Sequence, residues 1–243
     1  MKGQIKMYTL NRRVGYSAIH NNGKMKLGAF LDYMQDCEWF QIDSEKTFRE
    51  YLDAHNYGVF LLYRQVDIIR IPEYAENISV KTWIHELSKV HGVRNTNIYD
   101  EEGNPCIVSF GYGPFVNLEK GRPVKLPEEV MNTVLVEEKY PMEYLSRKIS
   151  IPKDREGIIC GEAVVGKSYI DSFNHMNNAR YPELALEYIP EDFDFNRVRM
   201  DYKKPSVYGE KLIIVKYDEE NSIKIVIKGE DDSVKGIFEF SKF

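Results

Sequence analysis

Apolar side chains recur at helical spacing in residues 27–44, where Leu27, Phe30, Leu31 and Met34 share one face. This spacing predicts one long helix. The pattern then changes to runs of β-branched and aromatic residues separated by polar turns, which predicts a series of strands. These strands are expected at residues 59–71, 78–84, 90–99 and 106–116, with residues 100–104 as a hairpin turn.

A second helix followed by strands is predicted near the end of the chain. Tyr181, Leu184, Ala185 and Tyr188 recur at helical spacing, and we expect this helix to begin near residues 177–178, with a proline in its first turn. Four further strands are expected at residues 198–204, 212–217, 223–228 and 234–240.

The two halves of the sequence resemble each other. Val14–Ile19 aligns with Val165–Ile170 at a shift of 151 positions, and four of the six residues agree. A second block, Pro72–Glu76, resembles Pro205–Glu210 once one extra residue is allowed. Because the matching pieces keep their order, the sequence predicts an internal duplication.

Each copy therefore runs strand, helix and four more strands, which indicates an antiparallel sheet wrapped around a helix. We predict an α+β protein with a tandem (double) hotdog fold, in which each half is a long helix wrapped by about five strands. The expected boundaries are residues 1–120 for the first repeat, 121–157 for a proline-rich surface linker with a short helix at 128–135, and 158–243 for the second repeat.

Composition narrows the class of protein. The chain has 243 residues and 43% hydrophobic content, enough for a substantial core. It lacks an apolar leader at residues 1–8 and any run long enough to cross a bilayer, so we expect a soluble cytoplasmic protein without membrane insertion. Three widely separated cysteines fit reduced thiols better than disulfides or a metal site; they are Cys37, Cys106 and Cys160.

The charge balance argues against nucleic-acid binding. The formal net charge is −5, whereas a nucleic-acid-binding domain is usually basic. Local basic runs occur at residues 12–13, 197–199 and 203–204. Each is typical of a solvated surface, but together they are also candidates for contact with an acidic carrier.

The densest cluster of reactive side chains is the segment Asp171–Tyr181, which holds a carboxylate, an imidazole and three asparagine amides just before the predicted second helix. A helix start offers unpaired backbone N–H groups that can stabilise an oxyanion. The alternative interpretation is a capped helix, in which Asn177 or Asn178 satisfies the first amides while Asp171 and His175 lie in a polar loop.

A second motif matches a known functional pattern only in its spacing. Gly161–Ser168 satisfies the spacing of a phosphate-binding loop. That loop normally follows a strand and opens directly into a helix, whereas the repeat predicts a strand across this stretch. Nucleotide binding is therefore not expected, and no Gly-x-Ser-x-Gly elbow of a serine hydrolase occurs.

Over nearly its whole length the chain resembles acyl-acyl carrier protein (acyl-ACP) thioesterases of the bacterial and plastid type. The resemblance implies hydrolysis of the thioester between a fatty acyl chain and acyl carrier protein, which releases free fatty acid and ends chain elongation. It implies no metal or organic cofactor, and the chain is expected to be a monomer or a homodimer. The segments that carry the resemblance are Asn22–Leu27, Leu31–Asp36, Tyr99–Gly103, Arg122–Pro127 and Asp171–Tyr181.

Within this resemblance, Asp171 and His175 fall on catalytic positions. We expect one of them to activate water, with their roles interchangeable, and N–H groups near Asn177 and Asn178 to hold the oxyanion. Asn174 is a candidate substitute for an amide that plastid members carry two residues before the histidine, where this chain has Phe173.

Other positions depart from the family. Plastid members have a glutamate and a cysteine where this chain has Pro205 and Ser206. The first copy has His20, Asn22 and Lys24 in place of the segment's Asp, Phe and His, so we expect only the second repeat to be catalytic and the first to bind the acyl chain. The candidate lining of the acyl slot is Phe30, Met34, Trp39 and Phe40, which also fit an ordinary core.

Two other functions remain open. A hotdog thioesterase acting on acyl-CoA would use the same segment. A non-catalytic module that binds acyl chains or the carrier also fits, because fold alone does not determine function.

Overall fold

The computed structural model describes residues 7–243, which form two compact units. Unit 1 contains residues up to Leu62 together with Ile68–Tyr144, and unit 2 contains Tyr63–Asp67 together with Leu145–Phe243. The first six residues, part of the segment expected to lack an apolar leader, lie outside the described range. In residues 7–243, no helix combines the length and the apolar character that a membrane span requires.

Unit 1 is an antiparallel sheet with helices. The strands follow the order β1-β4-β5-β6, and two short strands, β2 and β7, also pair with β6. The strand bounds are β1 Tyr8–Arg13, β2 Tyr57–Val59, β4 Asn77–Leu87, β5 His91–Tyr99, β6 Pro105–Asn117 and β7 Arg122–Pro123. The helices are α1 Leu27–Ser44, α2 Lys46–His55 and α3 Glu128–Met131, with a short 3₁₀ turn, η1, at Tyr16–Ala18.

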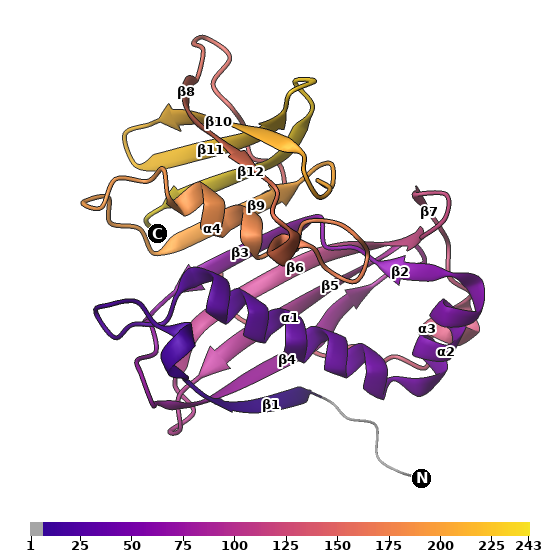
Figure 1. Ribbon diagram of the computed structural model, residues 1–243. Helices are drawn as coiled ribbons and strands as arrows, with labels where there is room; N and C mark the ends of the chain where they lie inside the picture. The colour runs from indigo at the N-terminus through magenta and orange to yellow at the C-terminus, as the bar shows by residue number, and fades with distance from the viewer. Residues whose placement is uncertain (1–6) are drawn as a thin grey trace. The chain divides into compact units, whose positions relative to one another are not determined.

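The long first helix is confirmed, because α1 has the bounds that the apolar spacing predicts. Figure 1 shows α1 lying along the sheet of unit 1, with β4 behind it. Phe30 is 1% exposed and Met34 is fully buried. The face that these residues share is therefore the face that packs on the sheet.

The segment after β6 is anchored to unit 1. Leu126, Val130 and Val134 are buried in a cluster with residues of α2. Farther on, the buried side chain of Asn95 accepts hydrogen bonds from Tyr140 N and Tyr144 Oη, both at 3.0 Å. This part of the expected surface linker thus contributes to the core, and its helix, α3, is shorter than predicted.

Unit 2 is a six-stranded antiparallel sheet in the order β3-β9-β12-β11-β10-β8. The expected strands of the second repeat are confirmed, and β8 covers residues 161–164 of the stretch that matches the phosphate-loop spacing. The bounds are β3 Tyr63–Ile68, β8 Ile158–Val164, β9 Arg197–Tyr202, β10 Lys211–Asp218, β11 Ser222–Gly229 and β12 Val234–Ser241, with a 3₁₀ turn, η2, at Lys167–Tyr169.

The helix of unit 2, α4, differs from the prediction. It spans Arg180–Leu186, seven residues, and so begins later and ends earlier than the spacing indicated. Tyr188 N bonds to Ala185 O at 3.2 Å, a tighter turn than an α-helix makes. Pro190 follows closely, and the residue before a proline avoids helical geometry, which ends the element. Only the first of the two predicted long helices is therefore present.

The duplication reappears as a matching hydrogen-bond pattern. Around the first block, equivalent backbone bonds are related by the shift of 151 positions seen in the sequence. The copies place Gly23 and Asn174, which are equivalent, at positive φ angles of 79° and 61°. In the first copy His20 N donates to Lys24 O, and in the second Asp171 N donates to His175 O. Likewise, Lys26 N donates to Ala18 O in the first copy, and Asn177 N donates to Tyr169 O in the second. All four distances are 2.8 Å.

Around the second block the shift is 134 positions. Met25 N donates to Pro72 O at 2.9 Å in the first copy, and Met176 N donates to Ser206 O at 2.8 Å in the second. Ser206 is therefore the equivalent of Pro72, and Pro205 is the extra residue that the sequence comparison allowed. The internal duplication is confirmed at the level of individual backbone bonds.

Candidate active site

The segment singled out in the sequence forms a closed loop between η2 and α4. Asp171 N donates to His175 O at 2.8 Å, and Asn174 N donates to Asp171 O at 3.1 Å. Asn174 lies at the turn of this loop with φ 61° and an exposed side chain. Asparagine tolerates this left-handed conformation better than most residues, so Asn174 has a conformational reason for its position.

The carboxylate of Asp171 is bonded to the loop itself. Its Oδ1 atom accepts hydrogen bonds from Phe173 N at 2.9 Å and from His175 N at 3.3 Å. Asp171 and His175 are thus brought together through the backbone, and both are half-buried. Within residues 7–243 the imidazole of His175 has no hydrogen-bond partner, which leaves the ring available to a substrate or to water.

The backbone N–H groups of the loop are mostly engaged. Asn177 N donates to Tyr169 O at 2.8 Å, and Asn177 Oδ1 accepts from Ala179 N at 2.9 Å. The N–H of Asn178 has no hydrogen-bond partner in the described part of the chain. The prediction that α4 begins near Asn177 is wrong, because this side-chain turn occupies residues 177–179 and the helix starts after it.

Three bonds fix the loop against its surroundings. Met176 N donates to Ser206 O at 2.8 Å, Ser206 N donates to Tyr181 Oη at 2.8 Å, and Tyr202 Oη donates to Asn178 O at 2.9 Å. Burial raises the pKa of Tyr181, so its phenol stays neutral at physiological pH. Sequence reasoning placed Tyr181 on the apolar face of a helix but gave no sign that its hydroxyl contacts residue 206.

The equivalent loop of the first copy lacks the acid and the imidazole. His20, Asn22 and Lys24 occupy those positions, and all three are exposed. The side chain of Asn22 accepts a hydrogen bond from Lys24 N at 3.0 Å. The two copies thus share a backbone frame but carry different chemistry on it.

The cysteines are poor nucleophiles. Burial raises the pKa of Cys37 to about 12. Burial also raises the pKa values of Cys106 and Cys160. The thiolate form, which is the reactive one, is therefore disfavoured at all three positions.

Two of the basic residues considered for carrier contact are internal. Arg197 is paired with Asp67 at 2.7 Å, and Arg199 is paired with Glu239 at 2.5 Å. All four side chains are almost fully buried. The run at residues 197–199 therefore serves the interior of unit 2 and offers no surface to a carrier.

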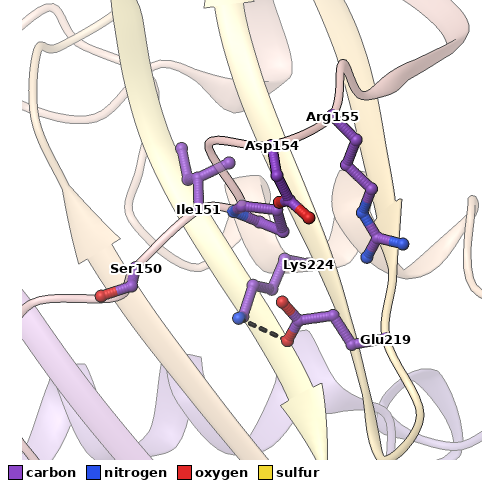
Figure 2. Close-up of a pocket in the computed structure, with 7 residues that line it drawn as sticks. Ser150, Ile151, Asp154, Arg155, Glu219 and Lys224 are labelled. Carbon is purple, nitrogen blue, oxygen red and sulfur yellow. Dashed lines mark hydrogen bonds and ion pairs between the residues drawn. The ribbon is translucent and has the colours of Figure 1, made fainter.

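A small pocket of about 330 Å³ lies in unit 2 beside the segment 150–155. Figure 2 shows that charged side chains surround it and that Lys224 is paired with Glu219, at 2.5 Å. None of its lining residues belongs to the loop 171–178. Within residues 7–243, no group of three or more His, Cys, Asp or Glu side chains is placed to hold a metal ion.

Two family descriptions match this chain. Residues 6–134 match the acyl-ACP thioesterase N-terminal domain, and residues 161–241 match the acyl-ACP thioesterase C-terminal domain. The chain belongs to the acyl-ACP thioesterase family. As a member, it is a thioester hydrolase that acts on acyl-ACP and releases free fatty acid.

Solved structures of acyl-ACP thioesterases have the same fold. An acyl-ACP thioesterase from Bacteroides thetaiotaomicron VPI-5482 is 21% identical, with a TM-score of 0.87 over 97% of both chains. The 12:0-ACP thioesterase from Umbellularia californica is 12% identical, with a TM-score of 0.85 over 99% of this chain and 98% of its own. No match is found among curated protein sequences.

Proposed function

We propose that the loop 171–178 is the centre at which this thioesterase cleaves the acyl-ACP thioester. One observation carries the proposal. The Asp171 carboxylate holds the backbone N–H of His175 in a closed loop, while the imidazole has no hydrogen-bond partner among residues 7–243. A carboxylate and an imidazole are therefore carried by one closed loop, which also contains the N–H of Asn178, unpaired within residues 7–243.

In the proposed reaction a water molecule attacks the thioester carbonyl carbon. His175 and Asp171 form the pair that orients this water and takes its proton. The carbonyl oxygen becomes an oxyanion, to which the N–H of Asn178, unpaired within residues 7–243, donates a hydrogen bond. The C–S bond then breaks, and the proton passes to the departing thiol of the carrier, so the products are a fatty acid and a free carrier thiol.

The other asparagines act around this centre. Asn177 supports the reacting groups by closing the turn before α4 with its side chain. Asn174 presents its exposed side chain at the tip of the loop, where substrate would approach. Neither role needs a metal or an organic cofactor.

The two repeats divide the work in this proposal. The second repeat, residues 158–243, is catalytic and the first repeat binds the acyl chain; of the connecting segment 121–157, the part up to Tyr144 also packs on unit 1. The candidate lining of the acyl slot includes Phe30 and Met34, which are buried on the apolar face of α1, whereas Phe40 is exposed. We place the enzyme in the cytoplasm as a monomer or homodimer.

The test uses the purified chain with a panel of acyl-ACP and acyl-CoA thioesters of different lengths. We expect faster release from acyl-ACP. His175→Ala should lower kcat by about 10²–10⁴-fold, the usual contribution of a general base. Lys24→Ala changes the equivalent position of the first copy and is the matched control; it should keep wild-type turnover.

Three results would contradict this proposal. Equal turnover by His175→Ala and the wild type would remove the loop as the reacting centre. Faster release from acyl-CoA would favour the acyl-CoA thioesterase. Binding of acyl-ACP without release of fatty acid would favour the non-catalytic module.

A further inference from the structure

In the two duplicated loops, different side chains accept a hydrogen bond from the equivalent backbone N–H group. In the first copy, Asn22 Oδ1 accepts the N–H of Lys24 at 3.0 Å. The equivalent residue of the second copy is Phe173, whose side chain has no acceptor. There, Asp171 Oδ1 accepts the N–H of His175 at 3.3 Å, and also that of Phe173 at 2.9 Å.

The residue equivalent to Asp171 in the first copy gives no such support. It is His20, whose side chain makes no hydrogen bond within residues 7–243. The two loops nevertheless share their backbone bonds, including the one from residue 20 or 171 to residue 24 or 175. In both copies a side-chain oxygen accepts the N–H at this position. In the first copy the acceptor lies two residues before Lys24, and in the second it lies four residues before His175.

We propose that Asp171 is a positioning residue, whose carboxylate replaces the amide missing at position 173 and fixes the backbone that carries His175. The inference rests on the proposed function of the same loop and narrows it. His175 is then the group that takes the proton from water. Asp171 acts through the loop, in which its Oδ1 atom accepts two N–H donors.

Rescue tests this role. Asp171→Ala should lower kcat by about 10²-fold with a smaller change in KM, the scale expected when a reacting group is misplaced. Adding Phe173→Asn to that variant rebuilds the support that Asn22 provides in the first copy. The double variant Asp171→Ala/Phe173→Asn should therefore recover at least about tenfold of the lost kcat.

Hydrogen exchange measured by NMR reports the same bond without reference to activity. Exchange of the His175 amide should quicken in Asp171→Ala and slow again in the double variant. Asn22→Ala is the matched control: it should quicken exchange at Lys24 and leave turnover at the wild-type level. Asp171→Asn keeps an acceptor oxygen, so it should be at least about tenfold more active than Asp171→Ala, with the acid limb of the pH profile of kcat/KM unchanged.

Two outcomes overturn the positioning role alone. In the first, the double variant protects the His175 amide but recovers no activity, which would make Asp171 a reacting group. In the second, Phe173→Asn fails to protect that amide. If the wild type releases no fatty acid from any thioester, the proposed function fails and this role falls with it, which the wild-type assay shows before any variant is made.

Discussion

Removing one partner of the buried pair between Asp67 and Arg197 should strongly destabilise unit 2. Arg197 Nε and Nη2 donate to the two carboxylate oxygens of Asp67 at 2.7 and 2.8 Å. The side chains are only 5% and 4% exposed. Asp67→Ala therefore leaves a guanidinium group without its carboxylate in a place that water hardly reaches.

The expected cost is about 3–5 kcal/mol of unfolding free energy, the usual result of breaking a buried ion pair from one side. For a chain of this size, 1 kcal/mol corresponds to a change in Tm of about 2–4 °C. Asp67→Ala should then lower Tm by about 6–20 °C. The double variant Asp67→Leu/Arg197→Met removes both charges and should lose much less, because no buried charge is left alone.

Urea unfolding followed by circular dichroism measures both variants. An exposed pair, Lys46 with Glu50, has side chains 84% and 67% exposed and serves as the control. Lys46→Ala should change the unfolding free energy by no more than about 0.5 kcal/mol. If Asp67→Ala cost as little as Lys46→Ala, or if the double variant cost as much as Asp67→Ala, the reasoning from burial would be refuted.

Three further predictions concern unit 1 and the thiols. Asn95→Ala should cost about 1–3 kcal/mol by orphaning buried hydrogen-bond partners and should speed tryptic cleavage at Lys139; an unchanged digestion rate would contradict the anchoring of that segment. Gly113→Ala should cost about 1–3 kcal/mol in urea unfolding, because its Cβ would lie 2.5 Å from Phe60 O, and a neutral result would show that this backbone yields easily. Iodoacetamide at pH 8 should leave turnover intact, because the pKa of Cys37 is about 12 and only a small thiolate fraction exists below it; rapid inactivation would reveal a reactive cysteine.

The sequence predicted the elements whose pattern is local. The apolar face of α1 is continuous over five turns, so its bounds follow directly from helical spacing. The other strands of both repeats are confirmed for the same reason, but the strand expected at residues 59–71 is divided into β2 and β3, and Tyr63–Asp67 belongs to unit 2. The length of α4 was not predictable from spacing alone, because Tyr188 keeps the helical period while Pro190 and the turn at Asn177 cut the helix at both ends.

The sequence predicted which segment holds the candidate site, but it did not predict the hydrogen bonds that its residues make. The reactive side chains are close in sequence, which is why Asp171 and His175 could be named without coordinates. The bond between Ser206 and Tyr181 joins residues 25 positions apart and depends on where the segment that follows β9 meets α4. The use of the Asp171 carboxylate by its own loop depends on the path of the backbone, which residue types alone do not define.

The matched loops have a consequence for how such a protein can evolve. Two identical subunits must carry the same residue at every equivalent position, so a change that suits one role is imposed on both. Here the two loops are encoded separately, and each can accept substitutions without altering the other. Fusion of the copies in a single chain thus permits the first loop to carry His20 and Lys24 while the second loop carries Asp171 and His175 at the equivalent positions.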